Sequence, residues 1–181
     1  FWENFIARTE AFWDNHYDLF RKIAPESFNG IAFKDFYQAI NEVKPSLIRI
    51  EADELTYCLH IMIRYELEKA LINSEIEVKD LPRLWNQKME EYLGIKPDTD
   101  TNGVLQDIHW SAGDFGYFPS YALGYMYAAQ FRHKMAEELN VDTLIKNGDF
   151  VPINKWLTKH IHQYGKLKKP LDILQDVTNE S

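Results

Sequence analysis

The residues best suited to chemistry lie in one segment between two expected helices. Gln106, Asp107 and His109 occur there, and Tyr117 and Tyr121 follow after two glycines. An amide, a carboxylate, an imidazole and two phenols therefore gather where glycines let the backbone bend. The segment is too apolar for a solvated tether, which is typical of a loop with a function. The residues also leave open a packed aromatic loop in which His109 is simply hydrogen-bonded.

Arg49 and Asp53 form a second candidate, because they are four residues apart. If a helix reaches back to Ser46, the two side chains share a face and can form an ion pair. Asp53 would then fix a guanidinium whose forked donors hold a substrate carboxylate through two hydrogen bonds. An ordinary surface ion pair of little energetic value fits the same spacing. Spacing alone does not separate the two interpretations.

The sequence contains no complete catalytic set. H-E-x-x-H, C-x-x-C, a glycine-rich phosphate loop and G-x-S-x-G are all missing from it. Cys58, the single cysteine, falls in the apolar middle of an expected helix, where an inert thiol is favoured over a nucleophile. His160 and His162 are two apart in an expected helix, so they point in different directions and are not expected to share a metal.

Helices must position these residues, because apolar side chains recur in steps of three and four along most of the chain. The pattern predicts helices over residues 2–23, 33–43, 46–72, 80–94, 119–139, 156–164 and 171–177. Gly94 is expected to cap one of them at its C-terminus. Residues 95–118 hold no period, and so long an irregular stretch is uncommon in a compact domain unless it has a task.

The fold class that follows is all-α, a compact bundle of six or seven helices around one core. A chain of 181 residues is long enough to bury a sizeable core. No internal repeat, low-complexity tract or linker divides it. We therefore expect residues 1–181 to form a single helical unit.

Charge and composition exclude several classes of protein. The net charge of −8 argues against a nucleic-acid partner or an anionic membrane surface, which would require a basic stripe. No apolar run approaches the roughly 20 residues of a membrane helix. One cysteine cannot form an intrachain disulfide, so nothing requires an oxidising compartment, and a cytoplasmic location is expected.

Two longer motifs resemble the signatures of a known family. Residues 48–53 read Ile-Arg-Ile-Glu-Ala-Asp, similar to I-R-x-x-A-D, and residues 103–110 read Gly-Val-Leu-Gln-Asp-Ile-His-Trp, similar to G-x-x-Q-D-x-H-W. Both signatures, in this order, are those of the thermostable metallocarboxypeptidases of the carboxypeptidase Taq type. The resemblance continues through residues 116–124 and 127–130 and covers nearly all of the chain.

The resemblance implies an all-helical, usually dimeric enzyme that removes single residues from peptide C-termini with one metal, typically zinc. In that family the two His of H-E-x-x-H and a later Glu hold the metal, upstream of the position that matches Phe1. The resemblance therefore implies a C-terminal fragment, less than half of a full member, inactive alone and without bound metal. Peptide C-termini would be the substrate of the parent enzyme, and a second copy would complete a homodimer.

The resemblance also implies roles for individual residues. A guanidinium held by a carboxylate suits the terminal carboxylate of a peptide, and donors aimed at the oxyanion stabilise the charge of the transition state. The residues with these roles would be Arg49, Asp53, Gln106 and Asp107 for substrate binding, and His109 with Tyr117 or Tyr121 for catalysis.

A protein of a different class stays open beside this one. A free-standing helical scaffold or interaction module could keep the shape of the family without its chemistry. The two hypotheses differ in what is encoded ahead of Phe1, because only the enzyme requires H-E-x-x-H there.

Overall fold

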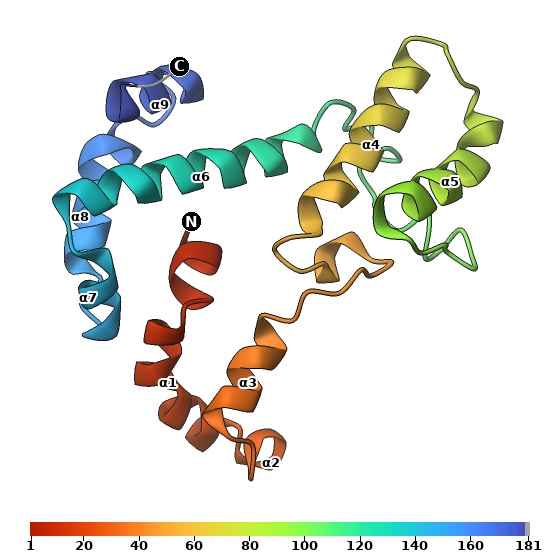
Figure 1. The fold of residues 1–181 in the computed structure, drawn as a ribbon. Coiled ribbons are helices and arrows are strands. Elements are labelled where there is room, and N and C mark those ends of the chain that lie inside the picture. Colours follow the sequence, from red (N-terminus) through yellow and green to blue (C-terminus); the bar gives the residue numbers. More distant parts are fainter. Residues whose placement is uncertain (180–181) are drawn as a thin grey trace. The chain divides into compact units, whose positions relative to one another are not determined.

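A computed structural model describes residues 1–179, which contain helices, turns and irregular segments but no strand. The all-α prediction is confirmed, and seven of the α-helices in this part of the chain have eight or more residues. The α-helices are α1 (Glu10–Ile23), α2 (Pro25–Phe28), α3 (Phe33–Ile40), α4 (Tyr57–Ile72), α5 (Leu81–Leu93), α6 (Pro119–Glu138), α7 (Val141–Lys146), α8 (Val151–His160) and α9 (Pro170–Thr178), all drawn in Figure 1. Within residues 1–179, none of the helices is both long enough and apolar enough to span a membrane.

The chain forms two compact units. Unit 1 contains residues 1–40 and the chain from Tyr125 onward, and unit 2 contains Asn41–Gly124. Each unit has its own cluster of buried apolar residues, so the apolar side chains do not gather in the one core that the sequence predicts. Two compact units can belong to one domain, so the single helical unit over residues 1–181 stays a prediction.

Unit 1 is packed around an apolar cluster. Its most deeply buried members are Met135 on α6, Ile145 on α7 and Ile153 on α8, each at most 1% exposed. The predicted helix over residues 2–23 is divided here into a π-helical turn at Trp2–Ala7 and the helix α1. Thr9 separates the two segments because its side chain accepts a hydrogen bond from the backbone N–H of Phe12 and caps α1.

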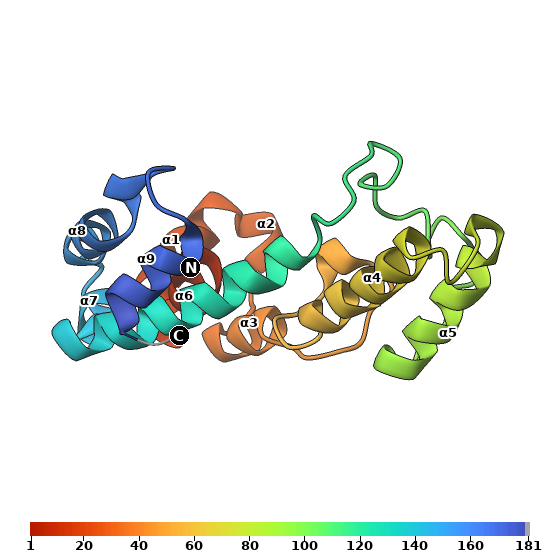
Figure 2. The same cartoon turned by 90° about the horizontal axis from the view of Figure 1, so that it is seen from above.

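Unit 2 contains a helical hairpin. The helices α4 and α5 lie side by side and are joined by a short connection, as Figures 1 and 2 both show. Ile63 of α4 and Trp85 and Met89 of α5 are almost completely buried in the cluster between them. α5 ends at Gly94, whose φ of 68° is left-handed, so the predicted glycine cap is confirmed.

The segment before α4 differs most from the sequence prediction. The expected helix over residues 46–72 begins only at Tyr57, and Arg49 lies in a short 3₁₀ turn at Arg49–Glu51. Residues 95–118 consist of turns and bends, as the missing periodicity predicts. Two irregular segments of unit 2 therefore carry most of the predicted site residues.

Candidate active site

The centre of the candidate site is the carboxylate of Asp107, which two guanidinium groups share. Arg49 donates from Nη2 to Oδ1 at 2.7 Å and from Nε to the same oxygen at 3.1 Å. Arg64 donates from Nε to Oδ2 at 2.6 Å. Arg49 is 6% exposed and Arg64 is fully buried, so both ion pairs lie away from bulk water. Charge-assisted hydrogen bonds of this kind are the strong ones.

Gln106 connects the same two arginines. Its Oε1 accepts from the backbone N–H of Arg49 at 2.8 Å and from Nη2 of Arg64 at 2.9 Å. Its Nε2 donates to three backbone carbonyl oxygens, those of Leu47, Asn102 and Gly103, at 3.0, 3.1 and 3.2 Å. The amide therefore fixes the loop that carries Asp107 against the turn that carries Arg49.

Asp53 does not hold Arg49, so the predicted pairing of these two residues is wrong. The carboxylate of Asp53 accepts hydrogen bonds from the backbone N–H groups of Leu55, Thr56 and Lys44 and from the Thr56 hydroxyl, at 2.8–3.0 Å. These bonds hold the turn that leads into α4, and they lower the pKa of Asp53 although its partial burial opposes the shift. The prediction failed because it required a helix through both residues.

Aromatic rings cover the two guanidiniums. The Cζ atom of Arg49 lies 5.1 Å from the ring centre of Tyr121 and 5.6 Å from that of Phe118, and Nη1 donates to the Tyr57 hydroxyl at 3.0 Å. The Cζ atom of Arg64 lies 4.6 Å from a ring centre of Trp85. Cation–π contacts at these distances are favourable, and the rings exclude water from the charges.

His109 reaches the same place from the loop. Its Nε2 lies 3.2 Å from the Tyr121 hydroxyl, and its ring stacks on Tyr117 with 5.7 Å between ring centres. Its Nδ1 lies 4.0 Å from Oδ1 of Asp107 and is buried without a hydrogen-bond partner among the described residues. Tyr117 is 48% exposed, whereas Tyr121 is half-buried. The structure thus brings Gln106, Asp107, His109, Tyr117 and Tyr121 together with Arg49.

The electrostatics of the cluster favour two cations and one anion. Burial alone would lower the pKa of Arg49, but the hydrogen bond and charge of Asp107 outweigh burial and raise it. Burial lowers the pKa of Arg64 to about 10, against the opposite effect of Asp107, and the group stays protonated at neutral pH. Burial opposes ionisation of Asp107, yet the two arginines hold its pKa below the ordinary value. The three side chains together carry a net charge of +1.

Arg64 and His60 are the site residues that sequence analysis missed. Both lie on α4 in the stretch that is apolar nearly all round, and both are fully buried. Burial, followed by the charges of Arg64 and Arg49, lowers the pKa of His60 to about 4, so its ring is neutral at pH 7. A signal was available, since a charged residue inside an apolar helix must find a partner.

Metal ligation does not fit the residues described here. Within residues 1–179, no group of three or more His, Cys, Asp or Glu side chains converges in a way that could hold a metal ion. The acidic group at the centre of the site, Asp107, is instead saturated by two arginines. No catalytic step is therefore assigned to a metal held by this chain.

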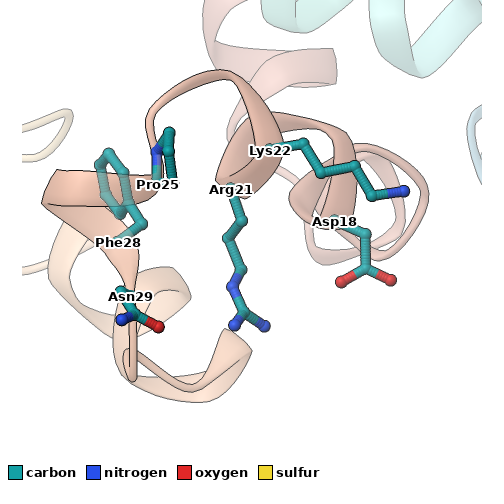
Figure 3. Close-up of a pocket in the computed structure, with 6 residues that line it drawn as sticks. All are labelled: Asp18, Arg21, Lys22, Pro25, Phe28 and Asn29. Atoms are coloured by element: carbon teal, nitrogen blue, oxygen red, sulfur yellow. The ribbon is translucent and has the colours of Figure 1, made fainter.

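A pocket of about 440 Å³ in unit 1 provides a contrast (Figure 3). It lies beside α1 and α2 and is lined by Asp18, Arg21, Lys22, Pro25, Phe28 and Asn29. Asp18 and Lys22 are exposed and Arg21 is half-buried, so water screens their charges. None of the predicted site residues lines this pocket.

Comparison with known proteins agrees with the fold and the motifs. Residues 1–181 match the family model described as carboxypeptidase Taq (M32) metallopeptidase. The chain therefore belongs to this metallopeptidase family, which confirms the resemblance of its two signatures.

Individual relatives are carboxypeptidases. The chain is 59% identical over 181 residues to Carboxypeptidase 1 of Bacillus subtilis (strain 168) and 38% identical to Thermostable carboxypeptidase 1 of Pyrococcus furiosus. A solved structure of Pyrococcus furiosus carboxypeptidase gives a TM-score of 0.95 at 36% identity, and the M32 carboxypeptidase from Deinococcus radiodurans R1 gives 0.92 at 34%. Each comparison covers 99% of this chain but only 36–37% of the relative, so the chain spans about a third of their length.

Proposed function

We propose that this chain supplies the carboxylate-binding part of a metallocarboxypeptidase that releases single residues from the C-termini of peptides. The observation that carries the proposal is the buried cluster of two guanidiniums around the single carboxylate of Asp107. A net positive charge among aromatic rings is stabilised by a second anion, and the C-terminus of a peptide supplies one. Family membership supports the proposal, because the relatives named above are carboxypeptidases.

Arg49 is the residue that we assign to the substrate carboxylate. Its contacts with Asp107 and Tyr57 occupy Nε and one N–H on each terminal nitrogen, so each terminal nitrogen retains a second N–H. Arg64 is completely enclosed, whereas Arg49 keeps a small exposed area. Gln106 and Asp107 would act by orienting Arg49, and Asp53 by fixing the turn that follows it.

His109 and Tyr121 are the proposed donors to the oxyanion. Peptide hydrolysis places negative charge on the carbonyl oxygen, and pre-positioned donors lower the barrier most when they point at that charge. The His109 ring and the Tyr121 hydroxyl already lie 3.2 Å apart beside Arg49. Tyr117 stacks on His109 and is the alternative donor.

The remaining parts of the proposal concern the full-length protein. The metal, typically zinc in this family, would be held by residues outside this chain. The chain alone would bind no zinc and would be inactive. Such a metal supplies an activated water and polarises the carbonyl group. We also propose a cytoplasmic homodimer. The single cysteine supports the compartment, and the family resemblance supports the dimer.

A kinetic assay of the full-length protein on a peptide with a free C-terminus tests these roles. We expect Arg49→Met to raise KM on the order of 100-fold, because hydrogen bonds to a charged group are lost. His109→Ala is expected to lower kcat roughly 100-fold with little change in KM, because its role belongs to the transition state. Arg83→Met is the matched control, since Arg83 belongs to the same unit and its side chain is 67% exposed.

The contrary outcomes are distinct. Loss of bound metal in Arg49→Met would indicate a structural role for the arginine. An effect of His109→Ala confined to KM would refute its role in the transition state. Full activity in both variants would refute the roles of Arg49 and His109, and absence of activity in the unsubstituted full-length protein would favour the helical scaffold over the enzyme.

A further inference from the structure

Arg64 uses every nitrogen of its side chain while completely buried. Nε donates to Oδ2 of Asp107 at 2.6 Å, Nη1 to the backbone oxygen of His60 at 2.8 Å and Nη2 to Oε1 of Gln106 at 2.9 Å. The ring centres of Trp85 and Phe118 lie 4.6 and 5.5 Å from its Cζ atom. The guanidinium is therefore held in one orientation by acceptors at its edge and by neighbouring rings.

Two of the three acceptors that Arg64 binds also bind Arg49. Asp107 gives Oδ2 to Arg64 and Oδ1 to Nη2 of Arg49 at 2.7 Å. Oε1 of Gln106 accepts from Arg64 and also from the backbone N–H of Arg49 at 2.8 Å. Two bridges thus join the arginines, one to the side chain of Arg49 and one to its backbone.

Stability alone gives little reason for a second buried guanidinium at this place. Burying a charge costs several kcal/mol, and apolar replacement of a whole buried ion pair is often neutral or stabilising. Arg64 also stands on the helix α4, a rigid element, whereas Arg49 and Asp107 belong to irregular segments. A guanidinium fixed on a helix can therefore hold side chains of both segments in defined positions.

We infer that Arg64 is a positioning residue that orients Arg49, through Asp107 and Gln106, for the terminal carboxylate of the substrate. The inference rests on the function proposed above and adds a residue that never touches the substrate. It also predicts that arginine is required at this position. A lysine keeps the charge but lacks the planar fork that reaches Asp107 and Gln106 together.

A double-mutant cycle in the full-length protein tests the inference. The variants are Arg64→Lys, Arg49→Met and the combination of both, with KM and kcat measured on a peptide that has a free C-terminus. We expect Arg64→Lys to raise KM on the order of tenfold with kcat nearly unchanged. Lysine keeps the charge but cannot hold Asp107 and Gln106 together, so these two residues orient Arg49 less firmly. In the Arg49→Met background, Arg64→Lys should change KM no further, since its effect passes through Arg49. Arg83→Lys is the exposed control and should leave KM unchanged.

The outcomes separate the inference from the function on which it rests. The same rise in KM with and without Arg49, or a loss of thermal stability at constant KM, would overturn the positioning role and leave the proposed function intact. An unchanged KM in Arg49→Met would overturn the proposed function itself. Should Arg64→Lys fail to fold, the cycle is repeated with Arg64→Gln, which keeps a planar amide donor at the same position on α4. A KM rise that disappears in the Arg49→Met background would again support the positioning role, and a rise that persists there would overturn it.

Discussion

Unit 1 closes around Met135, Ile145 and Ile153, whereas unit 2 buries charged side chains beside its apolar cluster. The buried polar and charged residues of the described chain are Arg49, Thr56, His60, Arg64 and Glu68, and all of them belong to unit 2. Apolar burial stabilises a fold without further conditions, but a buried charge requires a partner in fixed geometry. The difference agrees with the site proposed in unit 2, because fixed partners around a buried charge also hold that charge in one geometry.

Two ion pairs of equal length sharpen this comparison. Arg49 and Asp107 of unit 2 are 2.7 Å apart with side chains 7% and 11% exposed. Arg132 and Asp142 of unit 1 are also 2.7 Å apart, but the Asp142 side chain is 85% exposed. The same distance therefore corresponds to a pair that is largely shielded from water and to one that water screens.

The largest expected effect follows from removing one carboxylate charge from each pair. Asp107→Asn should lower the free energy of unfolding by about 3 kcal/mol or more, because two buried guanidiniums lose their counter-charge. Asp142→Asn should cost less than about 1 kcal/mol, as is usual for exposed pairs. Denaturant unfolding measures both, and equal losses would contradict the contrast between the units.

The second effect is a pH dependence that belongs to unit 2. The pKa of His60 is about 4 in the folded chain and 6.5 in its ordinary state, so the unfolded chain takes up the proton first as pH falls. Stability is then fully present above pH 6.5 and decreases by about 3 kcal/mol between pH 6.5 and 4. Asp107 does not contribute in this window, because its pKa lies below the ordinary carboxyl value.

Unfolding measured at several pH values in His60→Leu tests this origin. The variant should lose most of the slope between pH 4 and 6.5, because the titrating group is gone. His162→Leu, which alters an exposed histidine of unit 1, should keep the slope. A slope that survives in His60→Leu would assign the pH dependence to another group.

The smallest effect compares two caps. Asp53→Ala removes the acceptor for three backbone N–H groups in unit 2 and should cost about 1–2 kcal/mol. Asn140→Ala removes the cap of α7 in unit 1, where the side chain accepts from Thr143, and should cost about 1 kcal/mol. Thermal unfolding measures both losses. KM should change little in Asp53→Ala, and a large rise would restore the role in holding Arg49 that the sequence predicts for Asp53.

Sequence analysis predicted those parts of the fold that depend on local pattern. α6 begins at Pro119 and α5 ends at Gly94 as predicted, since a proline at a helix start and a glycine after its end act over a few residues. The helix expected from Ser46 was wrong because the Asp53 side chain binds backbone N–H groups and offers the chain an alternative to the helix. The spacing of apolar residues carries no information about this competition between side-chain and helical hydrogen bonds.

The sequence predicted most residues of the candidate site, but it did not predict which of them bind one another. The loop with Gln106, Asp107 and His109 stood out by its residue types. The partner of Arg49, however, is 58 residues away in the sequence, and helical spacing finds only neighbours three or four residues apart. Arg64 was passed over because a single charge in an apolar stretch leaves the hydrophobic pattern intact.

The division of one carboxylate between two cations has a consequence for engineering. Oδ1 of Asp107 accepts from Arg49, and Oδ2 accepts from Arg64 at 2.6 Å and from Nε of Arg49 at 3.3 Å, so both arginines fix the rotamer of this carboxylate. On the role proposed for Arg49, a redesign for substrates with a neutral or cationic terminus cannot begin by exchanging Arg49 alone, since Asp107 would lose one of its two buried counter-charges. Arg49, Arg64 and Asp107 have to be replaced together. Libraries that vary all three positions at once should yield folded variants more often than libraries that change one position at a time.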